Sequence, residues 1–125
     1  MNRRRAIRLT HTVFASILAA ALFAFTGCKS PYIATTVVND SGAPVSLIEV
    51  DYPSASFGRD ALAAGASFPY RFKIIGSGPT KISWTDTAHH DHNSTGPTLE
   101  QGEHGPLVIT LTSTGSVSWS AHLTP

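Results

Sequence analysis

Three histidines within four positions are the side chains of this 125-residue chain best suited to chemistry: His89, His90 and His92. Imidazole nitrogens bind zinc, copper and nickel, and two or three of them in a fixed geometry give useful affinity. Residues two apart on a strand share a face, so His90 and His92 are placed to bind one ion. Further ligands would come from Asp86, Glu103 or His104. The alternative interpretation is a solvated polar loop that binds no metal.

The second candidate for chemistry is Cys28, the single cysteine of the chain. Four arginines and then an apolar run over residues 13–25 precede it. A basic segment, an apolar segment of roughly 7–15 residues and a small residue before the cut are the parts of a secretory signal peptide. The apolar run is too short to span a bilayer comfortably, since a membrane helix needs about 20 apolar residues. The sequence therefore predicts export.

The Gly27-Cys28 junction resembles the lipobox of bacterial lipoproteins, with Phe25 where a branched aliphatic residue is usual. This resemblance implies a diacylglycerol on the Cys28 thiol and cleavage between Gly27 and Cys28. Residues 1–27 are then a cleaved signal helix and residues 28–31 a lipidated tether. Lys29 after the cysteine implies the outer membrane, because aspartate there is associated with inner-membrane retention. The alternatives are an uncleaved helix with a buried Cys28, and export through a twin-arginine signal at Arg4-Arg5.

The residues after Gly27 are enough for one domain. They carry five basic and eight acidic side chains, a net charge of −3. A mildly acidic domain lacks the basic patch that nucleic acid requires, so we expect no nucleic-acid partner. The sequence has no Gly-x-Ser-x-Gly elbow, and Gly76-Ser77-Gly78 lacks the lysine of a phosphate loop. We therefore expect neither catalysis nor a cofactor, with a small enzyme as the weakest alternative.

Alternating apolar and polar residues, rich in β-branched and aromatic types, predict strands through the rest of the chain. The predicted strands cover residues 33–38, 45–52, 56–58, 67–75, 81–85, 92–95, 106–111 and 116–123. Pro69 predicts an edge position for its strand, because proline donates no hydrogen bond to a neighbouring strand. Residues 60–64 are predicted to form one helical turn. Turns or breaks are predicted at 76–79 and 96–97.

Seven or eight short strands in residues 32–125 predict an all-β, antiparallel, two-layer sandwich, with a small barrel as the alternative. The pattern is similar to immunoglobulin-like and fibronectin-like modules, including residues 62–67 before an alternating strand. The predicted protein is lipid-anchored in the cell envelope, at the outer membrane facing the periplasm. Its expected role is non-catalytic binding or scaffolding of an envelope protein; the alternative is metal binding through residues 89–92. An exposed aromatic patch of Tyr52, Phe57 and Tyr70 is a further hypothesis, against core packing.

Overall fold

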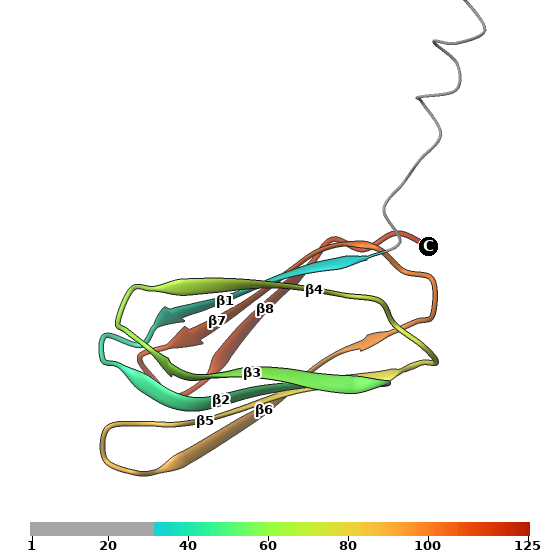
Figure 1. Ribbon diagram of the computed structural model, residues 1–125. Coiled ribbons are helices and arrows are strands. Elements are labelled where there is room, and N and C mark those ends of the chain that lie inside the picture. Colours follow the sequence, from blue (N-terminus) through green and yellow to red (C-terminus); the bar gives the residue numbers. More distant parts are fainter. Residues whose placement is uncertain (1–31) are drawn as a thin grey trace, which may run out of the picture. The chain divides into compact units, whose positions relative to one another are not determined.

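The computed structural model describes residues 32–125, and within them the chain forms eight strands and no helix. The strands are β1 (Ile33–Asp40), β2 (Val45–Tyr52), β3 (Ala55–Leu62), β4 (Ser67–Phe72), β5 (Gly78–Thr85), β6 (Asp91–Leu99), β7 (Gly105–Thr112) and β8 (Val117–Ala121). One sheet has the order β4-β1-β7-β8 and the other the order β3-β2-β5-β6 (Figure 1). No helix long and apolar enough to cross a membrane occurs in this part of the chain.

The two-layer all-β architecture is confirmed, but its strands are not all antiparallel as predicted. β1 and β7 pair in parallel, with Ile33 opposite Gly105 and Asp40 opposite Thr112. Each connection along the chain reverses its direction, so odd-numbered strands all run the same way (Figure 1). Two odd-numbered neighbours must then be parallel. The sequence pattern carries no information about which strands become neighbours across the sheet.

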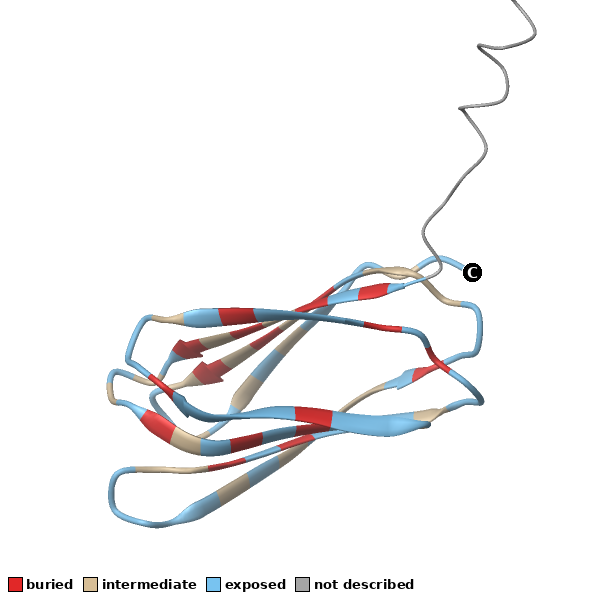
Figure 2. Ribbon diagram, in the orientation of Figure 1, coloured by how far each residue is buried: buried red, intermediate tan, exposed pale blue. Residues whose placement is uncertain are grey.

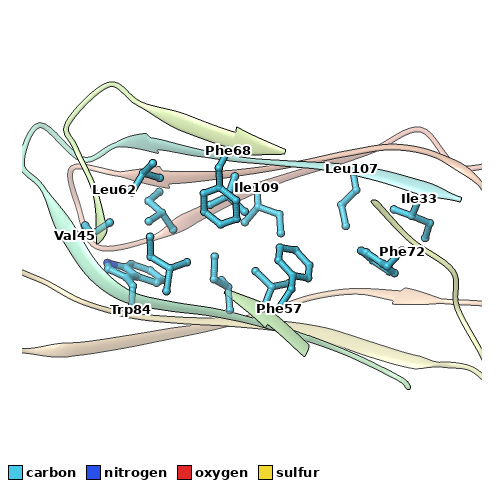
Figure 3. Packing of buried hydrophobic residues seen from close by; sticks show 14 of the residues in the cluster. Ile33, Val45, Phe57, Leu62, Phe68, Phe72, Trp84, Leu107 and Ile109 are labelled. Atoms are coloured by element: carbon cyan, nitrogen blue, oxygen red, sulfur yellow. The ribbon is translucent and has the colours of Figure 1, made fainter. Parts of the chain in front are cut away.

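The core lies between the two sheets and is built from the alternating apolar positions of the strands. β1 shows the pattern most clearly, since buried and more exposed residues follow one another along its whole length (Figure 2). Each fully buried aliphatic or aromatic side chain contributes about 1.5–3 kcal/mol through removal from water. Figure 3 shows side chains from both sheets meeting in one layer. The buried apolar residues are Ile33, Val37, Val45, Ile48, Val50, Phe57, Leu62, Phe68, Phe72, Ile74, Ile82, Trp84, Leu99, Leu107, Ile109 and Leu111.

Aromatic side chains close the sandwich along both of its long sides. On the side of β3 and β4, Phe57 packs edge-on against Phe68 and stacks on Tyr70, with ring centroids 6.3 and 4.1 Å apart. On the side of β6 and β8, the indole of Trp119 donates a hydrogen bond to Ser94 Oγ at 3.2 Å. These contacts join the edge strand of one sheet to the edge strand of the other.

At three places the local turn preferences of the residues predict the wrong structure. Residues 60–64 do not form a helical turn, because β3 continues to Leu62, which pairs with Val45. Gly78-Pro79 is not a turn but the start of β5, and β6 runs through Gly96-Pro97 to Leu99. Leu99 is fully buried, and a register shift between Pro79 and Lys81 accommodates the irregular pairing. Sheet pairing and burial therefore outweigh the glycine and proline preferences.

Pro69 lies where the sequence predicts, on an edge strand. β4 is the outermost strand of its sheet and pairs only with β1 among the described strands, with Pro69 opposite Thr36. An edge strand needs hydrogen bonds on one side only, so the missing N–H of proline costs little there.

The connections of the sandwich divide between its two ends. The β1–β2, β3–β4, β5–β6 and β7–β8 connections lie together at one end, on the left of Figure 1. We call this the loop end. The start of β1 and the C-terminus lie at the opposite end, where the backbone N–H of His104 donates to Thr124 O at 2.9 Å.

Thr35 provides a test of the core packing. Its Oγ1 is buried and has no hydrogen-bond partner among the described residues. Valine has nearly the same shape without the hydroxyl, so we expect Thr35→Val to raise the free energy of unfolding by about 1 kcal/mol. Urea unfolding followed by tryptophan fluorescence measures this change. A loss of stability would contradict the packing described for β1.

Candidate functional site

His89 and His90 lie in the β5–β6 connection at the loop end, in a tight hairpin turn, and His92 is the second residue of β6. Asp86 N donates to His90 O at 3.0 Å, and His89 N donates to Asp86 O at 3.1 Å. His89 adopts a left-handed backbone, with φ of 62°. A three-residue hairpin loop commonly ends with such a residue. His89 and His90 are exposed in this turn, whereas His92 is half-buried.

Asp86 is the centre of this turn, because both of its carboxylate oxygens accept hydrogen bonds. Oδ1 accepts from the backbone N–H groups of Ala88 and His90, at 2.8 and 3.0 Å. Oδ2 lies 2.7 Å from His92 Nε2 and 3.8 Å from His90 Nδ1. An ionised carboxylate only accepts hydrogen bonds, so the short contact requires the proton on His92 Nε2. The carboxylate thus links the turn to the first residues of β6.

These donors stabilise the charged form of Asp86. The hydrogen bond from His92, and then the backbone N–H of His90, lower the pKa of the Asp86 carboxyl from 3.8 to about 2. A carboxyl with a lower pKa in the folded state than in the unfolded state adds stability above the unfolded pKa. This contribution is present above about pH 4 and is lost as the pH falls toward about 2.

The pH dependence of Asp86→Asn tests this arrangement. We expect the wild-type chain to be more stable than the variant near pH 6, and the difference to shrink between about pH 4 and pH 2. The other acidic residues are the same in both chains, so the change in this difference below about pH 4 reports the Asp86 carboxyl. Urea unfolding at a series of pH values measures it. Two parallel curves across this range would contradict the assigned hydrogen bonds.

His92 lies beside Trp84 and the β7–β8 turn. Its imidazole stacks on the indole of Trp84, with ring centroids 5.1 Å apart and planes 13° from parallel. The two residues are direct partners across β5 and β6. Gly115 of the β7–β8 turn, with φ of 74°, also lies close to this ring; a Cβ there would be 3.2 Å from the imidazole. Glycine suits this position, because it allows the left-handed backbone and the close approach of the ring.

An open cavity of about 140 Å³ lies beside this histidine at the loop end. Four segments of the chain meet there: the β1–β2 connection, the end of β5, the start of β6 and the β7–β8 turn. The residues that line it are Ser41, Ala43, Pro44, Val45, Trp84, Asp86, His92, Thr112, Ser113 and Gly115. Hydroxyl groups, one carboxylate and an aromatic surface suit a polar side chain of a partner better than an apolar ligand.

The structure brings together only some of the predicted metal ligands. His90 Nδ1 and His92 Nε2 lie 3.8 and 2.7 Å from Asp86 Oδ2, whereas His89 occupies the left-handed position of the turn. Residues 32–125 contain no group of three or more histidine, cysteine, aspartate or glutamate side chains placed to hold a metal ion. His92 would have to exchange its Asp86 hydrogen bond for the metal. Metal binding through residues 89–92 stays a prediction.

Glu103 and His104 lie far from the predicted metal site. They are in the connection after β6, whose nine residues span about 30 Å. His104 bonds instead to the C-terminal segment, with Nε2 3.0 Å from Thr124 Oγ1. Glu103 accepts a hydrogen bond from the backbone N–H of Glu100. Neither residue can complete a ligand set with His90 and His92 in this fold.

The three predicted aromatic residues mainly complete the core. Phe57 is buried, Tyr52 is half-buried and stacks on Phe72 at 4.0 Å, and Tyr70 is 39% exposed. Burial raises the pKa of Tyr52, and the nearby Tyr70 hydroxyl adds to the effect. Tyr52 and Phe57 pack in the core, as the alternative to an exposed aromatic patch predicts. Tyr70 covers them from outside.

Asn39, Trp84 and Gly115 are site residues that the sequence analysis misses. Asn39 is fully buried, and its Nδ2 donates to Ala43 O in the β1–β2 connection and to Ala63 O in the β3–β4 connection. Its position at the end of an alternating apolar strand was the available signal. The predicted cleavage and lipidation site, Gly27 and Cys28, lies outside the described residues.

Comparison with known proteins supports the fold and gives no information about the function. No family model matches the chain, and no curated protein matches it. The fold is similar to the NMR structure of a protein from Eubacterium rectale, with a TM-score of 0.54 and 12% sequence identity. The match covers 75% of this chain and 93% of that chain. At this identity the similarity establishes a common β-sandwich-like fold and nothing about activity.

Proposed function

We propose that this chain is a lipid-anchored, non-catalytic binding module of the bacterial cell envelope. In this proposal Cys28 carries the lipid at the outer membrane, and residues 32–125 face the periplasm as an immunoglobulin-like sandwich. The basic and apolar residues before Thr26-Gly27-Cys28 support the anchor. The two four-stranded sheets support the sandwich class.

The observation that carries the binding role is the arrangement of the two ends. β1 begins at one end of the sandwich, directly after the proposed tether, and the four connections of the loop end lie at the other (Figure 1). A lipid on residue 28 would then hold the domain by the end where β1 begins and leave the loop end free for a partner. Binding residues in sandwich domains commonly lie on loops that a rigid sheet positions.

The hydrogen bonds of Asp86 favour binding over catalysis. Catalytic acids and bases need a pKa near the working pH, whereas the Asp86 carboxyl is held at a pKa of about 2. Its oxygens accept hydrogen bonds from Ala88, His90 and His92, which hold the β5–β6 turn in one conformation in this structure. A pre-ordered loop binds a partner with a smaller loss of conformational entropy.

Labelling with a fatty acid and crosslinking test the two parts of the proposal. The full chain in its native cells is expected to incorporate labelled fatty acid and to sediment with membranes, and Cys28→Ala to do neither. A photo-crosslinking residue at the exposed Ala88 is expected to join the chain to an envelope protein. An unlabelled wild-type chain rejects the anchor, and the absence of any crosslink from position 88 rejects the use of the loop end.

A further inference from the structure

Leu47 on β2 combines two properties that a leucine rarely has together. Its backbone has φ of 49°, in the left-handed region that side chains with a Cβ disfavour. Its side chain is 66% exposed, so it contributes little to the core. Strained backbone that packing does not require is found preferentially at functional sites. Leu47 is therefore the strongest departure from ordinary sheet structure in the described chain.

A β-bulge creates this geometry. Ser46 pairs with Thr85 and Glu49 pairs with Ser83, so β2 has one residue more than β5 between the two pairs. Ile48 keeps its place in the core and is 2% exposed, while Leu47 is turned out to solvent. Bulges are frequent beside functional sites, where they redirect a side chain.

The neighbouring strand is adapted to the bulge. Gly58 on β3 faces it, and a Cβ at this position would lie 2.2 Å from the carbonyl oxygen of Ile48. That oxygen is part of the backbone and cannot swing aside. The bulge thus depends on glycine at position 58, and two strands together present Leu47.

Two shallow depressions flank Leu47 on the outer face of its sheet, and both carry exposed acidic side chains. One includes Asp91 beside Ser83 and Asn93; the other includes Glu49 and Asp60. Arg59 also borders the second depression, but its guanidinium lies over the Phe68 ring at 4.6 Å. The result is an exposed apolar side chain surrounded by three carboxylates. We call Leu47, Glu49, Asp60 and Asp91 the Leu47 surface.

We propose that the Leu47 surface binds a partner protein through a segment that carries lysine or arginine beside an apolar side chain. Leu47 supplies the apolar contact, and the carboxylates select a basic partner by charge complementarity. The same carboxylates disfavour an anionic lipid surface or a nucleic acid. This inference rests on the proposed function, because it names the surface and the partner chemistry of the binding module.

Photo-crosslinking from the exposed Ser83, which lines the same depression as Leu47, tests the proposal in the full chain in its native cells. The expected result is one crosslinked protein whose joined segment, sequenced by mass spectrometry, contains a basic residue beside an apolar one. Leu47→Asn is expected to reduce this product at least tenfold. Asparagine tolerates the left-handed backbone, so the variant is expected to unfold at the same urea concentration as the wild type.

Ile75→Asn is the matched control, because Ile75 is equally exposed at 68% and lies outside the Leu47 surface. This variant should crosslink as the wild type does, and a probe at Ser118 on the other sheet should give no such product. An unchanged product in Leu47→Asn, a joined segment without basic residues, or crosslinks to lipid alone would each overturn the inference. If Ala88 gives crosslinks and Ser83 gives none, this inference is wrong and the proposed function stands. If neither position gives crosslinks, both are wrong.

Discussion

Asn39→Ala is expected to lower the free energy of unfolding by about 3 kcal/mol. The Asn39 side chain is fully buried and its Nδ2 donates to the carbonyl oxygens of Ala43, Leu62 and Ala63, at 2.8, 3.1 and 3.2 Å. Its Oδ1 accepts from the backbone and hydroxyl of Ser41. Alanine removes every one of these partners, and each buried polar group left unsatisfied costs about 1–3 kcal/mol.

The Asn39 substitution also removes contacts between the two sheets. Its bonds to Leu62 and Ala63 join the end of β1 to the end of β3 in the other sheet. Asn93→Ala on the exposed face of β6 is the matched control and should change stability by less than about 0.5 kcal/mol. Urea unfolding of both variants provides the comparison. If the two variants lose equal stability, Asn39 does not join the sheets as described.

Trp84→Ala is expected to lower the free energy of unfolding by about 4 kcal/mol, in the range for large aromatic side chains removed from a core. Trp84 is 3% exposed and packs in the layer that both sheets share (Figure 3). It also supports His92, which stacks on its indole. The variant should therefore lose the ordered position of the His92 ring as well as stability.

The second tryptophan provides the control for this substitution. Trp119 is only half-buried on the edge strand β8, so Trp119→Ala should cost less than half as much as Trp84→Ala. Chemical shifts of the His92 ring in solution NMR should change in Trp84→Ala and stay near the wild-type values in Trp119→Ala. A larger loss of stability in Trp119→Ala would contradict the core described here.

The sequence predicts a strand well where its inward positions are apolar and a residue that breaks strands ends the run. Residues 45–52 are predicted with the bounds that β2 has, because each inward position is apolar and Pro53 ends the run. Prediction fails at residues 60–64, 78–79 and 96–97, where glycine, proline or alanine indicates a turn. There the pairing partner decides the structure, and that partner is distant in the sequence. The parallel pair of β1 and β7 is unpredictable for the same reason.

The candidate site could be predicted only in its local part. Asp86, His90 and His92 are close in sequence, so their convergence is within reach of sequence reasoning. Gly115 packs against His92 from the β7–β8 turn, more than twenty residues away. Leu47 and Ile48 are adjacent apolar residues, and the one-residue shift between β2 and β5 decides which of them is exposed. Contacts of this kind depend on the register of strands and not on residue type.

Lipid attachment to Cys28 is the central claim, and intact-mass spectrometry of the chain purified in detergent from its native cells tests it most directly. The predicted result is a chain that begins at Cys28, without residues 1–27, and whose mass exceeds that of the polypeptide by several acyl chains. A chain that begins at Met1 and carries an unmodified thiol at Cys28 would contradict the anchor and the orientation of the domain derived from it.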